Sequence, residues 1–314
     1  MKNKTDNHII FLSYGDPFYL PYVLSQCKAY HPYDHVHLIG DSSNKGYAGI
    51  EHHLISDYEN SAKEFAKHYV HLSTNNEKFE RFCFDRFFII KEFIIKNNIK
   101  ECIIIDTDVL VYGNLFDDFP FFDNYDCTLY LYEKNLVASP GLSFVKNTKC
   151  IDDLCRFMLE LYKERNSIFD LLSNHFNHRQ SKGLQGGACD MNVFYYFYKN
   201  NTVKVFDLFE VLPNNHYYDI SFIDLETVKY TFEGTPETGK KVIFKNKIPY
   251  GIIHGRKEMI KYQVLHFQGW QKELIPRFTT RKGRFFLYNM IWIPVKNFIA
   301  AMLRGQWSLY FNFK

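Results

Sequence analysis

Two aspartates one residue apart, Asp106 and Asp108, follow the short apolar run 102–105 (Cys-Ile-Ile-Ile). Three consecutive isoleucines are typical of a strand buried on both faces of a parallel sheet. Ligands bind such sheets beyond the carboxyl ends of the strands. In an extended chain the two carboxylates point the same way and repel each other, unless a cation lies between them or one is protonated. The spacing favours a divalent metal site with oxygen ligands, and the alternative is an Asp-rich turn.

A second candidate group follows the last predicted strand, residues 262–267. His266 is placed either to be a third metal ligand through a neutral ring nitrogen or to be a buried core histidine. Lys272, six residues further on, is a point charge suited to contacting a diphosphate.

A long amphipathic helix is predicted over residues 79–97, with an inward stripe of apolar side chains. Arg86 lies among aromatic residues of this helix, and we expect it to reach the phosphates or the sugar of a bound nucleotide. For Arg81 and Lys91 we favour the alternative, a solvated basic face.

Asp190 follows a glycine pair, Gly186-Gly187, and precedes an aromatic helix predicted at 193–198. Glycines allow a close backbone approach or a positive φ. Asp190 is either the N-cap of the helix or a carboxylate that faces the substrate. The preceding residues 166–184 are polar, and we expect them to form an irregular, mobile or substrate-facing loop.

The elements that position these residues are those of an α/β fold. Strands are expected at 8–12 and 36–39 with a helix at 18–29 between them, which is a βαβ unit with parallel strands. Asp16 and Asp41 each follow one of these strands and are expected at the same sheet edge as Asp106. Further elements are predicted as helices at 60–72 and 151–164 and as strands at 109–112 and 127–131.

Composition excludes several classes of protein. The 314 residues suffice for one large domain, and 46% hydrophobic content is normal for a globular protein. A net charge of +3 gives no indication of nucleic-acid binding. The seven cysteines form no CxxC pair, which fits a reducing cytosol better than a disulfide framework or a zinc site. We expect no signal peptide and no transmembrane span.

The end of the chain, residues 281–314, contains no acidic residue and has cations on both sides of the Trp- and Phe-rich run 285–295. This pattern is typical of an amphipathic helix at an anionic membrane surface. The alternative is a helix docked on the protein's own core. We therefore divide the chain into a domain at 1–280 and a basic helical tail at 281–314.

Three segments together resemble bacterial nucleotide-sugar glycosyltransferases of the GT-A fold, over roughly residues 9–272. Residues 103–108 (Ile-Ile-Ile-Asp-Thr-Asp) look like the DxD motif of that family. Residues 186–192 (Gly-Gly-Ala-Cys-Asp-Met-Asn) are similar to the segment that meets acceptor and donor sugar. Residues 266–272 (His-Phe-Gln-Gly-Trp-Gln-Lys) look like the HxxGxxK motif of the family 8-like retaining transferases.

The resemblance implies a Rossmann-like single domain with a mostly parallel central sheet and a hexosyltransferase activity, retaining in its family 8-like form. It implies that Mn²⁺ or Mg²⁺ is bound by the metal ligands Asp106, Asp108 and His266. The metal, with Gly269 and Lys272, would hold the diphosphate of a UDP-sugar. The other residues that the resemblance places at the donor are Asp16 and Asp41 near the nucleoside, with Asp190 and Arg86 at the reacting groups.

The implied product is a cell-surface polysaccharide such as lipopolysaccharide or capsule, made from a glycan or glycolipid acceptor at the cytoplasmic face of the membrane. Two alternatives remain open. One is a nucleotidyltransferase of related fold, although no Gly-rich basic loop that would cradle a triphosphate is evident. The other is a non-catalytic sugar- or membrane-binding protein with a degenerate site.

Overall fold

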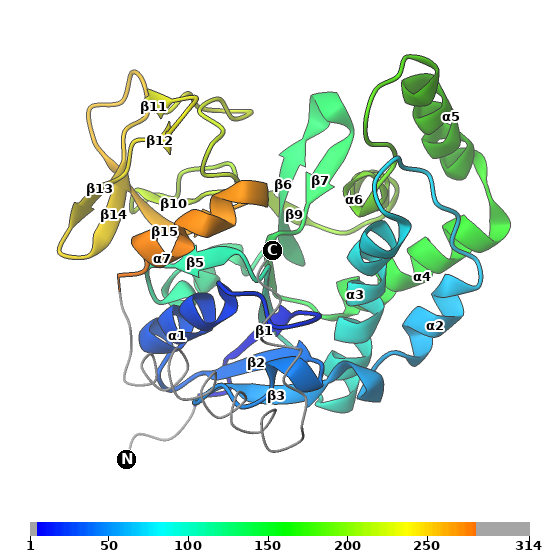
Figure 1. Cartoon of the computed structure of the whole chain (residues 1–314), viewed down its shortest axis with the longest axis horizontal. Helices are drawn as coiled ribbons and strands as arrows, with labels where there is room; N and C mark the ends of the chain where they lie inside the picture. The colour runs from blue at the N-terminus through cyan, green and yellow to red at the C-terminus, as the bar shows by residue number, and fades with distance from the viewer. Residues whose placement is uncertain (1–4, 281–314) are drawn as a thin grey trace, which may run out of the picture.

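The computed structural model describes residues 5–280, and an eight-stranded sheet runs through the middle of this part of the chain (Figure 1). The strand order is β3-β2-β1-β4-β8-β6-β7, with β9 beside β6. Four of the pairings are parallel and three are antiparallel, which confirms the expected α/β class with a mostly parallel central sheet. The strands are β1 (His8–Leu12), β2 (His35–Gly40), β3 (Glu51–Leu54), β4 (Cys102–Ile105), β6 (Cys127–Tyr132), β7 (Val137–Ser139), β8 (Leu142–Val145) and β9 (Val205–Asp207).

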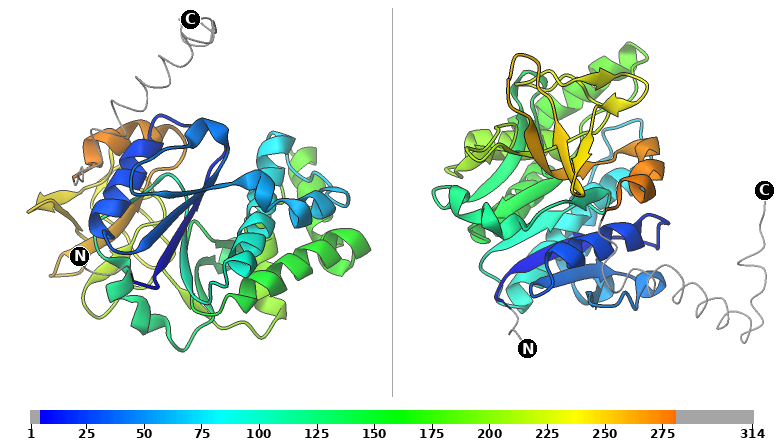
Figure 2. Two further views of the ribbon diagram at one scale, coloured as in Figure 1. Left: turned by 90° about the horizontal axis from the view of Figure 1, so that it is seen from below. Right: turned by 90° about the vertical axis from the view of Figure 1, so that its left-hand side faces the viewer.

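Helices cover both faces of this sheet. Figure 2 shows α1 and α7 on one side and α2, α3 and α4 on the other. The reason lies in the alternation of side chains along a strand, since Ile103 and Ile105 join one core and Ile104 joins the other. The helices are α1 (Leu20–Tyr30), α2 (Asn60–Ala66), α3 (Glu77–Lys96), α4 (Lys149–Glu164), α5 (Ser167–Ser181), α6 (Asp190–Asn200) and α7 (Ile275–Phe278).

A second sheet contributes His266, at the end of its strand β15, to the pocket described below. Its order is β10-β15-β14-β13, with β5 on the other side of β15. The pairing of β5 with β15 is antiparallel and sets His266 opposite Val109, directly after Asp108. The strands are β5 (Val109–Val111), β10 (His216–Tyr218), β13 (Ile243–Lys245), β14 (Ile248–Gly251) and β15 (Ile260–His266), and a small separate hairpin is formed by β11 (Gly234–Thr235) and β12 (Gly239–Lys240).

Short 3₁₀ turns connect several of these elements. The turn that matters for the pocket is η6 (Gly269–Leu274), which follows β15 and carries Lys272. The others are η1 (Ser42–Asn44), η2 (Ile55–Asp57), η3 (Leu115–Asp117), η4 (Phe119–Phe122) and η5 (Glu133–Asn135).

The predicted βαβ unit is confirmed, because β1 and β2 are parallel neighbours joined through α1. The predicted helix at 79–97 is α3, which is capped by Asn76, whose side chain accepts hydrogen bonds from the backbone N–H groups of Lys78 and Phe79. Glu77 and Glu80 in its first turn complement the helix dipole.

The prediction of an irregular loop at 166–184 was wrong, since Ser167–Ser181 forms helix α5. The Asn166 side chain accepts from the N–H of Ile168 at 3.0 Å and so caps its start. Phe169 and Leu172, three residues apart, are the buried positions of this helix. The sequence around them is polar on the other faces, and that composition concealed a short helical stripe.

Two other boundaries differ from expectation. The helix predicted at 60–72 ends at Ala66, because the following chain runs beside the glycine pair, where Ala188 N–H donates to Leu72 O at 2.8 Å. The strand predicted at 109–112 belongs to the second sheet, and a turn with Val109 N–H donating to Asp106 O separates it from β4. No helix within residues 5–280 has both the length and the apolar character needed to cross a bilayer. The predicted tail at 281–314 lies outside the described residues.

Candidate active site

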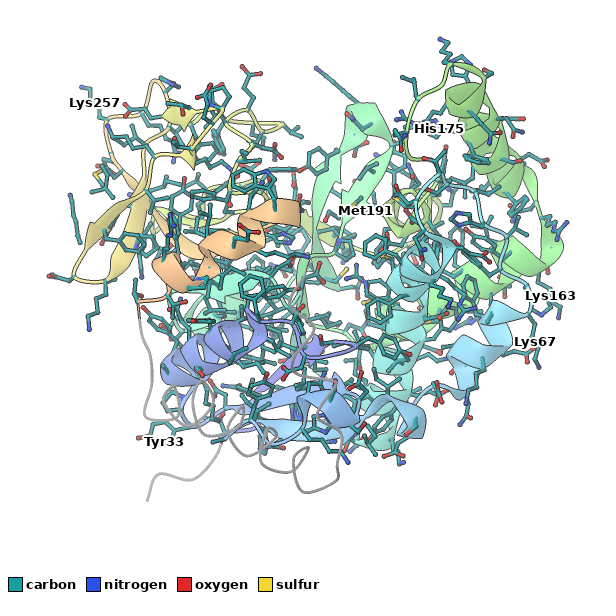
Figure 3. All side chains as sticks on the ribbon, in the orientation of Figure 1. Tyr33, Lys67, Lys163, His175, Met191 and Lys257 are labelled. Atoms are coloured by element: carbon teal, nitrogen blue, oxygen red, sulfur yellow. The ribbon has the colours of Figure 1, made fainter. Side chains whose placement is uncertain are left out.

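A pocket of about 720 Å³ opens at the carboxyl ends of β1 and β4. Its walls come from the loops after these strands, from α3, from the start of α6 and from η6. Figure 3 labels Met191, a wall residue, where the first turn of α6 approaches α3. The sheet edge is where ligands bind in open α/β folds. Of the predicted site residues, the pocket walls include Asp106, Asp108, Asp190, Arg86, His266, Gly269 and Lys272.

Asp106, Asp108 and His266 converge at the base of the pocket. One ligand atom from each lies within 4.8 Å of the other two. His266 Nε2 is 3.0 Å from Asp108 Oδ1. The backbone fixes this arrangement, because Asp106 N–H donates to Gly141 O at 2.9 Å and Phe267 N–H donates to Asp108 O at 3.0 Å. Two carboxylates and one imidazole form a donor set that suits a divalent cation such as Mn²⁺.

Gly141 makes room for these three side chains. A Cβ atom at this position would lie 3.0 Å from His266 Cε1 and 3.4 Å from Asp106 Oδ2. Any larger residue would therefore push the imidazole or the carboxylate away from its present place. No sequence motif marks this glycine, which directly precedes β8.

Lys272 reaches the same carboxylate from η6. Its Nζ lies 3.2 Å from Asp108 Oδ2 and 5.5 Å from the centre of the Tyr19 ring. Gly269 begins η6 with a φ of 57°, a left-handed conformation that glycine adopts readily. The HxxGxxK spacing thus turns the chain back after β15 so that the lysine faces the metal ligands.

Arg86 connects the two ends of the pocket. Its Nη1 lies 2.6 Å from Asp106 Oδ1, and its Nη2 lies 3.1 Å from Asp190 Oδ2. The side chain is 17% exposed, which excludes a solvated basic face for this arginine. Arg81, by contrast, is 44% exposed and pairs with Asp85 one turn further along α3, and Lys91 is 21% exposed and pairs with Asp152 of α4.

The three carboxyl groups differ in their pKa values. Burial raises the pKa of Asp190 to about 6, with Arg86 acting in the opposite direction. Burial also raises the pKa of Asp106 despite its contact with Arg86. For Asp108, burial is outweighed by His266 and Lys272, which lower its pKa to about 2. Strongly shifted carboxyl groups in a pocket are typical of functional sites.

Asp190 is the first residue of α6 and is almost completely buried. It is not the N-cap, because that position is Cys189, whose N–H donates to the Asn192 side chain at 3.1 Å. The glycine pair brings this helix close to the chain before α3: a Cβ on Gly187 would lie 2.1 Å from Leu72 O. The carboxylate is therefore free of a capping role and faces Arg86.

Asp16 and Asp41 are not among the residues that line the pocket. Asp16 accepts a hydrogen bond from the Tyr47 hydroxyl. Asp41 accepts from Gly15 N–H at 2.6 Å and from Ser43 N–H at 2.7 Å. Both carboxylates hold the loop after β1 in place, and it is other residues of that loop, Ser13, Tyr14 and Pro17, that reach the pocket.

No protein-family model matches the sequence, and no curated protein does. Mouse xyloside xylosyltransferase 1 in its apo form is 10% identical with a TM-score of 0.42, covering 65% of this chain and 85% of its own. The galactosyltransferase LgtC in complex with donor and acceptor sugar analogs is 13% identical with a TM-score of 0.40, covering 87% and 95%.

A glycosyltransferase involved in glycosylation of the major capsid of PBCV-1 is 14% identical with a TM-score of 0.39, covering 86% of this chain and 98% of its own. All three are glycosyltransferases. At these levels of identity and superposition the function of this chain has to be argued from its own pocket.

Proposed function

We propose that this chain is a metal-dependent glycosyltransferase that moves a hexose or N-acetylhexosamine from a UDP-sugar to a glycan or glycolipid acceptor. The observation that carries the proposal is the convergence of Asp106, Asp108 and His266 within 4.8 Å, beside Lys272, at the carboxyl end of β4. A site that binds a cation and a diphosphate together needs negative carboxylates for the cation directly beside a positive side chain for the phosphates.

Asp106, Asp108 and His266 hold Mn²⁺ or Mg²⁺. The ion supplies Lewis-acid stabilisation of the negative charge that develops on the leaving diphosphate. The residues fit the role because their ligand atoms already lie within 4.8 Å of one another. Gly141 supports this arrangement, because a side chain there would press on His266 and Asp106.

Lys272 and Arg86 supply fixed positive charge. Lys272 lies on the open side of the metal ligands, so its Nζ binds the diphosphate as a point charge while Gly269 allows the backbone to approach it. Arg86 holds Asp106 and Asp190 in position and offsets their charge when the donor is bound.

Asp190 stabilises the oxocarbenium-like sugar, and the reaction retains anomeric configuration. The support is positional. Asp190 and the metal ligand Asp106 contact the same Arg86 guanidinium, which supports a place for Asp190 beside the leaving group. The base of an inverting transferase deprotonates the acceptor on the opposite face of the sugar. The anomeric configuration of the product, read by NMR, tests this assignment, and inversion would refute it.

Asp16 and Asp41 act on the nucleoside indirectly, by fixing the loop after β1 that carries Ser13 and Tyr14 to the pocket. The uridine lies against this loop, as expected for the edge of the sheet next to β4.

The acceptor belongs to cell-surface polysaccharide such as lipopolysaccharide or capsule, and the enzyme works peripherally at the cytoplasmic face of the membrane. The basis is the acid-free, basic and aromatic sequence of 281–314. A chain cut after Thr280 should hydrolyse donor normally but no longer sediment with anionic vesicles. Unchanged sedimentation would refute membrane contact through this segment.

The central experiment is a UDP-sugar hydrolysis screen with Mn²⁺ and with a chelator. Metal-stimulated turnover with at least one donor is expected for the wild type and should disappear in Asp108→Asn, with the fold retained. The matched control is Asp34→Asn. Asp34 also belongs to a buried Asp–His pair, with its Oδ2 2.7 Å from His31 Nδ1, but it does not line the pocket. Metal-independent turnover, or equal turnover by Asp108→Asn, would contradict the proposal.

A further inference from the structure

A second group of metal-ligating side chains lies on β1, β2 and β3, away from the pocket. His8 and His35 are neighbours in the register of β1 and β2, and His37 and Glu51 are neighbours in that of β2 and β3. Since alternate residues of a strand point to the same face, His35 and His37 share one face with each other, as Glu51 and His53 do.

Their polar atoms are close together. His35 Nδ1 lies 2.8 Å from Glu51 Oε1, and His37 Nδ1 lies 3.7 Å from Glu51 Oε2. One ligand atom of each of these three residues lies within 4.8 Å of the other two. His53 lies next to this group, with its Nε2 3.1 Å from His37 Nδ1. A tetrahedral zinc site with bonds of about 2.0–2.2 Å places neighbouring ligand atoms roughly 3.3–3.6 Å apart.

The cluster combines a buried ring with a side that is open to solvent. His37 is buried, and its ring lies 5.1 Å from that of Phe93, which also contacts His53 at 4.7 Å. A neutral imidazole ring is the form that binds metals. His35 and Glu51 are partly exposed and leave the cluster open on one side.

The cluster lies at the opposite end of the parallel strands from the pocket. His8 and His35 begin their strands, whereas the pocket forms where β1 and β4 end. In Figure 3, Tyr33, two residues before His35, is far across the molecule from Met191, which lines the pocket. A ligand of the cluster therefore does not share the catalytic chemistry.

We propose that His35, His37 and Glu51, with His53 next to His37, bind a divalent transition-metal ion such as Zn²⁺ that links β2 to the edge strand β3. Imidazoles with one carboxylate suit zinc, whereas the oxygen-rich pocket suits Mn²⁺ or Mg²⁺. His8 takes the role of a partner to the ligand, since its Nδ1 is 3.0 Å from His37 Nε2 and orients that ring.

The test is a zinc titration of the full chain carrying Asp106→Asn and Asp108→Asn, which removes two donors from the pocket. We expect one zinc per chain by elemental analysis after dialysis, and a Co²⁺ adduct with the visible absorption of tetrahedral cobalt. Adding His35→Gln and Glu51→Gln should weaken zinc binding by at least about 100-fold, because losing only a partner of a ligand already costs 10–100-fold.

The matched control is His52→Gln, since His52 lies between Glu51 and His53 on β3 but points to the other face and bonds to Asn44 Oδ1 at 2.9 Å. It should bind zinc like its parent. Zinc should also raise the melting temperature of the parent chain, which carries Asp106→Asn and Asp108→Asn, and of its His52→Gln variant. It should not raise that of the variant with His35→Gln and Glu51→Gln. Should the chain with both substitutions fail to fold, Glu51→Gln alone, at a partly exposed site, answers the same question. A parent that retains no zinc, or equal binding after loss of Glu51, would overturn the proposal.

Discussion

Replacing Arg86 by methionine removes the cation that joins Asp106 to Asp190. Methionine keeps the apolar length of the side chain beside the Phe87 ring, 4.7 Å from the guanidinium, and loses only the charge and the hydrogen bonds. In the wild type the guanidinium nitrogens lie 2.6 Å from Asp106 Oδ1 and 3.1 Å from Asp190 Oδ2. In the variant both carboxylates remain in the pocket without this partner.

The expected loss follows from burial. At an effective dielectric constant of about 20, each contact supplies roughly 5–6 kcal/mol of gross attraction, most of which offsets the desolvation of the charges. Removing one partner of a buried ion pair typically lowers the free energy of unfolding by about 3–5 kcal/mol, because the other charge is left uncompensated. We expect a loss of this size for Arg86→Met at pH 8 in the presence of a chelator.

The loss should shrink at acid pH. The pKa of Asp190 is already about 6, and it rises further without Arg86, which lowers it in the wild type. Between the unfolded value near 3.9 and this raised pKa, the folded protein binds more protons than the unfolded one, so its stability falls as pH rises. At pH 5 the protonated Asp190 carboxyl group needs no cation, and the difference in stability between the variant and the wild type should be smaller.

Urea unfolding at pH 5 and pH 8 measures both values. The control is Arg156→Met, an exposed arginine of α4, which should change stability by no more than about 0.5 kcal/mol at either pH. A loss for Arg86→Met that is the same at both pH values, or below about 1 kcal/mol at pH 8, would refute the view that Arg86 neutralises buried carboxylates.

Three further substitutions test the pocket and the fold. Lys272→Ala should weaken UDP binding by calorimetry about 10- to 100-fold, the worth of a charge-assisted hydrogen bond, and unchanged affinity would exclude a diphosphate contact. Gly141→Ala should weaken Mn²⁺ binding about 10-fold without unfolding the chain, since its Cβ would displace a ligand; an unaffected dissociation constant would count against these ligands. Lys240→Met should cost about 3–5 kcal/mol of stability because its buried partner Asp219 loses its cation. UDP binding should be unaffected, and a cost below about 1 kcal/mol would show that the pair is dispensable.

Local patterns were enough to predict the first half of the sheet. The β-branched and apolar runs at His8–Leu12 and Cys102–Ile105 are short, continuous and bounded by turn residues, so only buried strands fit them. The convergence of His266 on Asp108 was also predicted, although 158 residues separate them, because motif spacing carries information that periodicity does not.

The ion network could not be predicted in the same way. Arg86 and Asp190 are 104 residues apart, and their contact depends on how α3 and α6 pack against the sheet. The sequence identified both residues as candidates but gave each a separate role on a bound ligand. Only the packing shows that the arginine is held between two acidic groups.

The imidazole cluster is a case where the signal was present in the sequence and was missed. His37 lies on the strand predicted at 36–39 and His35 directly precedes it, and the Glu51–Leu54 strand, which was not predicted, begins with a carboxylate followed by two histidines. Alternation alone places these residues on one face once the two strands are neighbours.

The contacts of Asp108 explain why metal and donor should favour each other's binding. Asp108 Oδ1 lies 3.0 Å from His266 Nε2 and its Oδ2 lies 3.2 Å from Lys272 Nζ, so each oxygen already has one nitrogen partner. Lys272 is held there by attraction to a buried carboxylate. If Asp108 and His266 shared a divalent ion, as proposed above, that attraction would weaken and Lys272 would be free to contact a second anion. The diphosphate is that anion in the proposed reaction. Lys272→Ala should therefore reduce the coupling between Mn²⁺ and UDP as well as the affinity for UDP itself.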